Sequence, residues 1–85
     1  MPQLYKVKVE VVLRSGHSDP EGDTTAEVLR DLGYPVEGVK VNKIYTITLR
    51  ASTPGEAEQL ADDMARRLLA NPTKDIYTIQ VEELE

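Results

Sequence analysis

The chain has 85 residues, the size of one domain, so we expect residues 1–85 to fold as a single unit. Apolar residues make up 40% and charged residues 29%, as in soluble globular proteins, and without cysteine neither a disulfide nor a thiolate zinc site can form. The net charge is −5, and no basic cluster exceeds the pair Arg66 and Arg67, which argues against a nucleic-acid partner.

The length of the chain and the distribution of its apolar residues also predict its location and its association. The longest aliphatic run, residues 11–13, falls far short of the roughly 20 residues that a membrane-spanning helix needs. The first residues show no signal-peptide pattern, so we expect a cytoplasmic protein without a membrane partner. A chain this short buries only about 60–65% of its unfolded surface, so we expect self-association to add to a thin folding stability.

The first two elements are a strand and a short helix. Residues 5–13 have apolar residues at every odd position and charged ones at positions 6, 8 and 10, the period of a strand with one buried face. Residues 15–23 are polar and contain Gly and Pro, so they predict a loop. Thr24 and Glu27 form a capping-box pattern at the start of a helix with one apolar face, and Gly33 stands where its C-cap is expected.

Residues 39–49 allow two interpretations. Their odd positions are apolar apart from Lys43, and a three-residue turn at 42–44 keeps the apolar set on one face. A continuous, bent strand does the same. We favour the hairpin, because it makes an antiparallel sheet, which suits strands that have one polar face.

The second helix has the clearest signals. Thr53 is a predicted N-cap, with Pro54 at the first helical position and Glu56 completing the box. One apolar stripe follows, and it comprises Ala57, Leu60, Ala61, Met64 and Leu68. Asn71 and Pro72 end this helix, and residues 76–81 form a last strand. The order β-α-β-β-α-β predicts an α+β fold of ferredoxin-like topology, with two helices on one face of an antiparallel sheet.

Patterns typical of catalysis are not found in the sequence. His17 lies in a Gly-containing loop with Ser15 and Ser18 beside it, and a solvated loop histidine is the simpler interpretation. No phosphate-binding glycine loop occurs. Asp62 and Asp63 are neighbours on a helix, where adjacent side chains diverge by about 100°, so a solvated helix face is expected. The residues thus predict no catalytic, cofactor-binding or metal-binding site in this chain.

Five segments in order suggest a family. They are YKVKV at residues 5–9, DPEG at 19–22, LGY at 32–34, VKVNK at 39–43 and LLANP at 68–72, with Tyr77 after them. In this order and spacing the chain resembles the PurS subunit family of phosphoribosylformylglycinamidine (FGAM) synthase, over nearly its whole length. It departs from the family pattern at Asn42, where a turn glycine is usual, at residues 17–18, and at 73–76.

The resemblance implies a non-catalytic subunit of an ATP-dependent carbon–nitrogen ligase in purine biosynthesis. That complex converts formylglycinamide ribonucleotide to its amidine with ammonia from glutamine. A glutaminase subunit and a synthetase subunit are the implied partners, and the synthetase uses ATP and Mg²⁺. The small subunit is expected to bridge them and to assist ammonia transfer. A small-molecule-sensing domain of the ACT type shares the element order and remains the alternative.

The expected topology also places a partner surface. Because strand directions alternate, the connections at residues 15–23, 42–44 and 71–75 should lie at one end of the sheet. The predicted interface residues there are Asp19, Pro20, Gly22, Lys43, Asn71 and Pro72. Pro20, Gly22, Asn71 and Pro72 equally suit turns and a helix stop. The sheet face away from the helices mixes apolar and polar residues, which predicts association between the sheets of two copies as a homodimer, or as a dimer of dimers.

Overall fold

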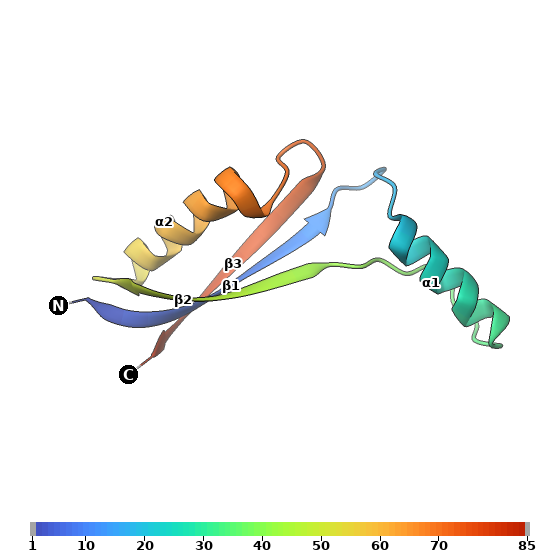
Figure 1. Ribbon diagram of the computed structural model, residues 1–85, viewed down its shortest axis with the longest axis horizontal. Coiled ribbons are helices and arrows are strands. Elements are labelled where there is room, and N and C mark those ends of the chain that lie inside the picture. Colours follow the sequence, from blue (N-terminus) through green and yellow to red (C-terminus); the bar gives the residue numbers. More distant parts are fainter. Residues whose placement is uncertain (1, 85) are drawn as a thin grey trace.

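The computed structural model describes residues 2–84, which form a long antiparallel sheet, a helix packed on it and a second helix that projects from one end (Figure 1). The elements are β1 (Gln3–Leu13), α1 (Pro20–Asp31), β2 (Lys43–Ala51), α2 (Pro54–Met64), a π-helical last turn (Ala65–Leu69) and β3 (Asp75–Leu84). No helix among the described residues is long and apolar enough to cross a membrane.

The sheet has β1 at its centre, in the order β2-β1-β3, and both pairings are antiparallel. Val7 lies opposite Ile47 on one side and opposite Val81 on the other, so the odd-numbered residues of all three strands share one face. Tyr5, Val7 and Val9 on this face are almost completely buried. The predicted α+β class and the antiparallel sheet are therefore confirmed, in an arrangement consistent with a ferredoxin-like topology.

The predicted hairpin within residues 39–49 is wrong. One strand begins at Lys43, and residues 39–42 continue from it without reversing direction (Figure 1). No described non-glycine residue has a positive φ, so Asn42 does not adopt the left-handed turn conformation. The backbone N–H of Val41 instead donates to the Asp19 carboxylate. The structure is thus closer to the continuous alternative, and the described residues form three strands rather than four.

Helix α2 covers the sheet through a seam of small residues. Ala57 and Ala61 on α2 and Ala65 in the π-helical turn that follows it are fully buried and belong to the same core as Tyr5 and Val7. Their small side chains let the helix approach the strands closely. The N-terminus of α2 is capped as predicted, because the Thr53 hydroxyl accepts a hydrogen bond from the Glu56 backbone N–H and Glu56 accepts one from Ser52.

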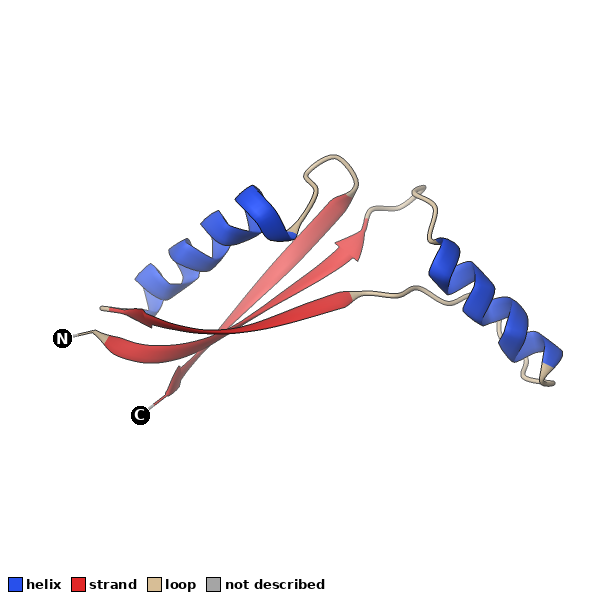
Figure 2. Cartoon of the chain, in the orientation of Figure 1, coloured by secondary structure: helices blue, strands red, loops and turns tan. Residues whose placement is uncertain are grey.

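Helix α1 differs from its prediction in two respects. It begins at Pro20 rather than near Thr24, because the Asp19 carboxylate accepts a hydrogen bond from Gly22 and Pro20 occupies the first helical turn. It also lies beyond the end of the sheet and not on the face that α2 covers (Figure 2). We call residues 14–42, which contain α1 and the segment that returns to β2, the arm.

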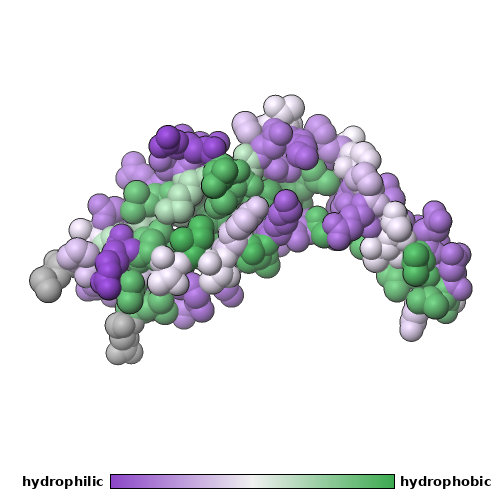
Figure 3. All heavy atoms as spheres, viewed as in Figure 1, coloured by the Kyte–Doolittle hydropathy of each residue, from purple (hydrophilic) through white to green (hydrophobic). Residues whose placement is uncertain are grey.

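The arm makes the chain unusually elongated. Its Cα radius of gyration is 16.6 Å and its extents are 55 × 28 × 14 Å, whereas a compact domain of this length has a radius of gyration of about 12 Å. Figure 3 shows apolar side chains along the body beneath α2 and, separately, at the far end of the arm. Val28, Leu32 and Tyr34 on the arm are 51%, 69% and 58% exposed. The apolar side of α1 therefore lacks a cover within this chain's described residues.

Candidate partner interface

One end of the molecule collects the connections that the sequence predicted to lie together. Lys43, the first residue of β2, pairs with Val11, and Asp75, the first residue of β3, pairs with Leu13 at the end of β1. We call this end of the sheet, with its three connections, the loop end. Lys43, Asn71 and Pro72 all lie here, whereas Asp19, Pro20 and Gly22 lie where the arm begins.

A cleft of about 160 Å³ opens at the loop end. Its lining combines aliphatic side chains with two lysines and one aspartate: Val11, Leu13, Val41, Lys43, Leu69, Lys74 and Asp75. Lys43 is exposed and forms no ion pair within residues 2–84. The position of Lys43 on the core-facing side of β2 is therefore tolerated, because the core ends there and the ammonium reaches solvent.

The loop between the π-helical turn and β3 is shaped by its own side chains. The Asn71 amide oxygen accepts a hydrogen bond from the Thr73 backbone N–H at 2.9 Å. The Asp75 carboxylate accepts one from the Asn71 N–H at 2.8 Å. Pro72 is exposed, and its carbonyl lies 3.5 Å from a guanidinium nitrogen of Arg14. Asn71 thus holds the loop in shape, while Pro72 presents a free surface.

Asp19, Pro20 and Gly22 form the base of the arm. The Asp19 carboxylate accepts hydrogen bonds from the backbone N–H groups of Val41 and Gly22. Both bonds stabilise the charged form of Asp19 and so lower its pKa, and the bond from Val41 has the larger effect. Gly22 is buried, whereas Pro20 is exposed at the start of α1. Two of the three residues predicted to contact a partner therefore make contacts inside the chain.

A side-chain network between α2 and β3 was not predicted. The Tyr77 hydroxyl donates to one oxygen of Asp62 at 2.5 Å, and Arg66 Nε lies 2.8 Å from the other oxygen. The hydrogen bond from Tyr77 is the main cause that lowers the pKa of Asp62, and the same bond raises the pKa of Tyr77. Asp62 is half-buried, so the expected solvated helix face holds only in part.

Sites for catalysis or metal binding are not evident in the part of the chain that the structure describes. His17, Ser15 and Ser18 are all exposed, and His17 lies in the turn after β1. Within residues 2–84 no three His, Asp or Glu side chains lie together in a way that could hold a metal ion.

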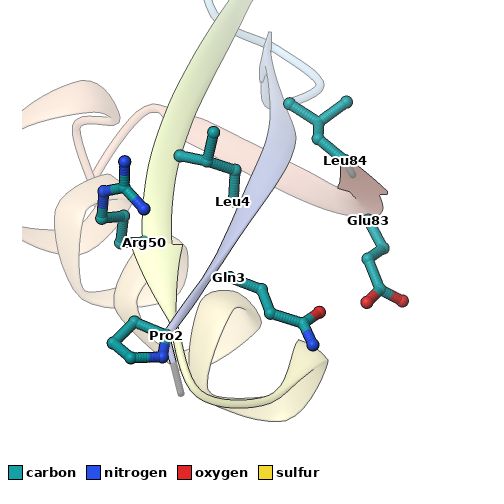
Figure 4. Close-up of a pocket in the computed structure, with 6 residues that line it drawn as sticks. All are labelled: Pro2, Gln3, Leu4, Arg50, Glu83 and Leu84. Carbon is teal, nitrogen blue, oxygen red and sulfur yellow. The ribbon is translucent and has the colours of Figure 1, made fainter.

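A second concave surface, of about 410 Å³, lies at the opposite end of the sheet. All three strands contribute to it, because Leu4 pairs with Arg50 on β2 and with Leu84 on β3. Figure 4 shows the side chains of Leu4 and Leu84 directed to the same side of the sheet, with the Glu83 carboxylate directed the other way. This surface combines two leucines with one guanidinium, and it is an extension of the sheet face that α2 leaves open.

Comparisons with known proteins identify the family. The family model described as PurS, phosphoribosylformylglycinamidine (FGAM) synthase, matches residues 6–83. The chain belongs to the PurS family. A PurS subunit of FGAM synthase from Archaeoglobus fulgidus is 39% identical over 72 residues, which are 84% of this chain and 90% of that protein.

Solved PurS structures share the whole fold. The crystal structure of Methanocaldococcus jannaschii PurS, one of the subunits of formylglycinamide ribonucleotide amidotransferase in the purine biosynthetic pathway, has a TM-score of 0.84 and 33% identity. That match covers 95% of this chain and 99% of the other. A PurS chain in the structure of PurLQS from Thermotoga maritima has a TM-score of 0.82 and 33% identity, over 99% and 100% of the two chains.

Proposed function

We propose that this chain is the small subunit of a cytoplasmic FGAM synthase, the ligase that makes formylglycinamidine ribonucleotide in purine biosynthesis. The observation that carries this proposal is the end-to-end match to a PurS chain within the PurLQS structure. A family match over residues 6–83 supports the same role, because it spans the arm, the sheet and the loop end together.

Within that complex the chain bridges the glutaminase and the synthetase and assists the passage of ammonia between them. A longest extent of 55 Å suits a bridging role, because the arm carries exposed apolar residues beyond the end of the α2-covered sheet. The cleft beside Lys43 and the exposed ring of Pro72 supply one docking surface, and Asp19, Pro20 and Gly22 adjoin it at the base of the arm. ATP and Mg²⁺ are used by the synthetase, and this chain acts without a catalytic site or a cofactor of its own.

The chain also associates with itself, as a dimer or a dimer of dimers. A radius of gyration well above that of a compact domain supports this, as do the exposed apolar residues of the arm. Free monomers rarely leave such a surface open to water. On the open sheet face, Ile44 and Ile76 are 61% and 47% exposed and offer a second apolar contact.

Reconstitution with the glutaminase and synthetase subunits tests the bridging role. Adding this chain should raise amidine formation strongly when glutamine is the nitrogen source and much less when free ammonia is supplied. Lys43→Ala should weaken assembly while leaving the melting temperature unchanged, because Lys43 is exposed and unpaired within the described residues. Equal stimulation with both nitrogen sources would contradict a part in ammonia transfer.

The chain alone should hydrolyse neither glutamine nor ATP. Turnover by the isolated chain would overturn its assignment as a non-catalytic subunit.

A further inference from the structure

One carboxylate ties the start of α1 to the returning segment of the arm. Asp19 Oδ1 accepts a hydrogen bond from the Gly22 backbone N–H at 2.9 Å, which caps α1. Asp19 Oδ2 accepts a second from the Val41 N–H at 2.8 Å, in the segment that leads into β2. The two oxygens therefore connect the first turn of α1 to the end of the returning segment, just before β2 begins at Lys43.

The same junction is closed sterically at Gly22. A Cβ atom at this position would overlap the carbonyl oxygen of Val39, so the first turn of α1 lies in direct contact with the backbone of the returning segment. Gly22 is buried, although it lies in the first turn of a helix whose other early residues are exposed. Only a residue without a side chain permits this approach.

The rest of the arm is braced internally. Arg30 donates through Nε to the Val36 carbonyl at 2.8 Å and through its terminal nitrogen to the Glu37 carbonyl at 2.9 Å. These bonds fasten the returning segment to the last turn of α1. Since α1 has no extensive packing against the sheet, the direction of the braced arm depends on the junction at its base.

We propose that Asp19 and Gly22 form a clasp that fixes the direction of α1 relative to the returning segment and, because that segment continues directly into β2, relative to the sheet. The clasp sets which surface of a second copy the apolar side of α1 can reach. That consequence rests on the self-association proposed above, whereas the positioning of the arm does not. In this role Asp19 is a positioning residue rather than a partner contact.

Asp19→Asn separates the two functions of this carboxylate. Asparagine is as good an N-cap as aspartate, so its amide oxygen keeps the bond from Gly22. Its amide nitrogen is a donor and would face the Val41 N–H, which is also a donor, so the bond to the returning segment is lost. Gly22→Ala opens the same junction sterically while favouring the helix. Asp23→Asn is the matched control, because Asp23 is exposed in the same turn and makes no side-chain bond within residues 2–84.

Spin-label distance measurements can follow the arm directly. The sequence has no cysteine, so Asp31→Cys on the arm and Gln59→Cys on α2 would create one label pair on exposed positions. Labelled chain should be diluted with unlabelled chain to remove distances between copies. The parent protein and Asp23→Asn should give one narrow distance, and both clasp variants should lose it in favour of a broad or shifted distribution. Far-UV circular dichroism should show α1 retained in Asp19→Asn.

An unchanged narrow distance in Asp19→Asn and Gly22→Ala would overturn the clasp. Light scattering of the parent protein tests self-association separately. A monomeric parent whose arm still loosens in both variants would refute self-association and leave the clasp standing. An oligomeric parent whose arm is unaffected in both variants would overturn the clasp and leave self-association standing.

Discussion

Replacing Leu32 with aspartate should dissociate the self-associated form. Leu32 is 69% exposed in the single chain, so most of its surface remains available for burial in a contact. Full burial of a leucine side chain is favourable by about 1.5–3 kcal/mol, and the part still exposed corresponds to roughly 1–2 kcal/mol. A two-fold interface uses each residue twice, which makes the loss roughly 2–4 kcal/mol for a dimer. The dissociation constant should therefore rise about 30- to 1000-fold.

Sedimentation velocity across a concentration series measures this change. Gln59→Asp places the same charge on the exposed side of α2, and it should leave the dissociation constant unchanged. Circular dichroism should show both variants folded, because neither side chain belongs to the core. Unaltered association of Leu32→Asp would refute a contact through the arm. Ile76→Asp would then test the alternative contact through the open sheet face.

Three further predictions concern the body of the molecule. Val7→Ala removes two methyl groups from a fully buried site and should lower the unfolding free energy by about 2–3 kcal/mol. In calorimetry the melting temperature should fall by roughly 10–20 °C. A loss of less than about 1 kcal/mol would contradict the packing of Val7 in the core. Tyr77→Phe should raise the pKa of Asp62 toward its ordinary value, seen by NMR titration, and an unmoved pKa would exclude the hydrogen bond. The pKa values of Asp19 and Asp62 are lowered by folding, so their stabilising effect is complete above the ordinary value of 3.8 and is lost as pH falls through the lowered values. Urea unfolding from neutral to acid pH should show this loss of unfolding free energy, and the loss should be smaller in Asp62→Asn.

The sheet and α2 could be predicted because their signals are local and agree with one another. Odd-position apolar residues such as Val7 predict which face is buried, and the register bears this out. The cap at Thr53 predicts where α2 starts, whereas the predicted apolar stripe gives its buried side only in part: Ala57 and Ala61 are buried, but Leu60 and Leu68 are 39% and 83% exposed. The loop end followed in the same way from alternating chain direction, which brought Lys43 and Asp75 to one end of the sheet.

The hairpin could not be excluded from pattern alone. A turn at 42–44 and a continuous chain place the same apolar residues on the same face, so the alternation of apolar residues does not distinguish the two. The hydrogen bond from Val41 to Asp19 distinguishes them, and it joins residues 22 positions apart. The network of Tyr77 with Asp62 was missed for a related reason, because it joins side chains of two elements that are 15 positions apart in the sequence.

The position of α1 exposes a limit of amphipathic patterns. An apolar helix side predicts that the side is buried, but it does not say in which molecule. Here Val28 and Leu32 stay exposed in the single chain, and the predicted packing of both helices on one sheet face is met only by α2. A sequence reading that assumes a compact monomer will place such a helix on its own sheet.

Folding and assembly should therefore be thermodynamically linked in this chain. The body has a narrow core whose helix contributes mainly alanines, while the arm keeps its larger apolar residues outside it. A chain of this size has little stability to spare, so burial of the arm against another molecule adds to the unfolding free energy of the folded state. Its melting temperature should consequently rise with protein concentration, and it should rise again when the glutaminase and synthetase subunits are present. An isolated compact domain would show neither dependence, because its unfolding free energy contains no term from a partner.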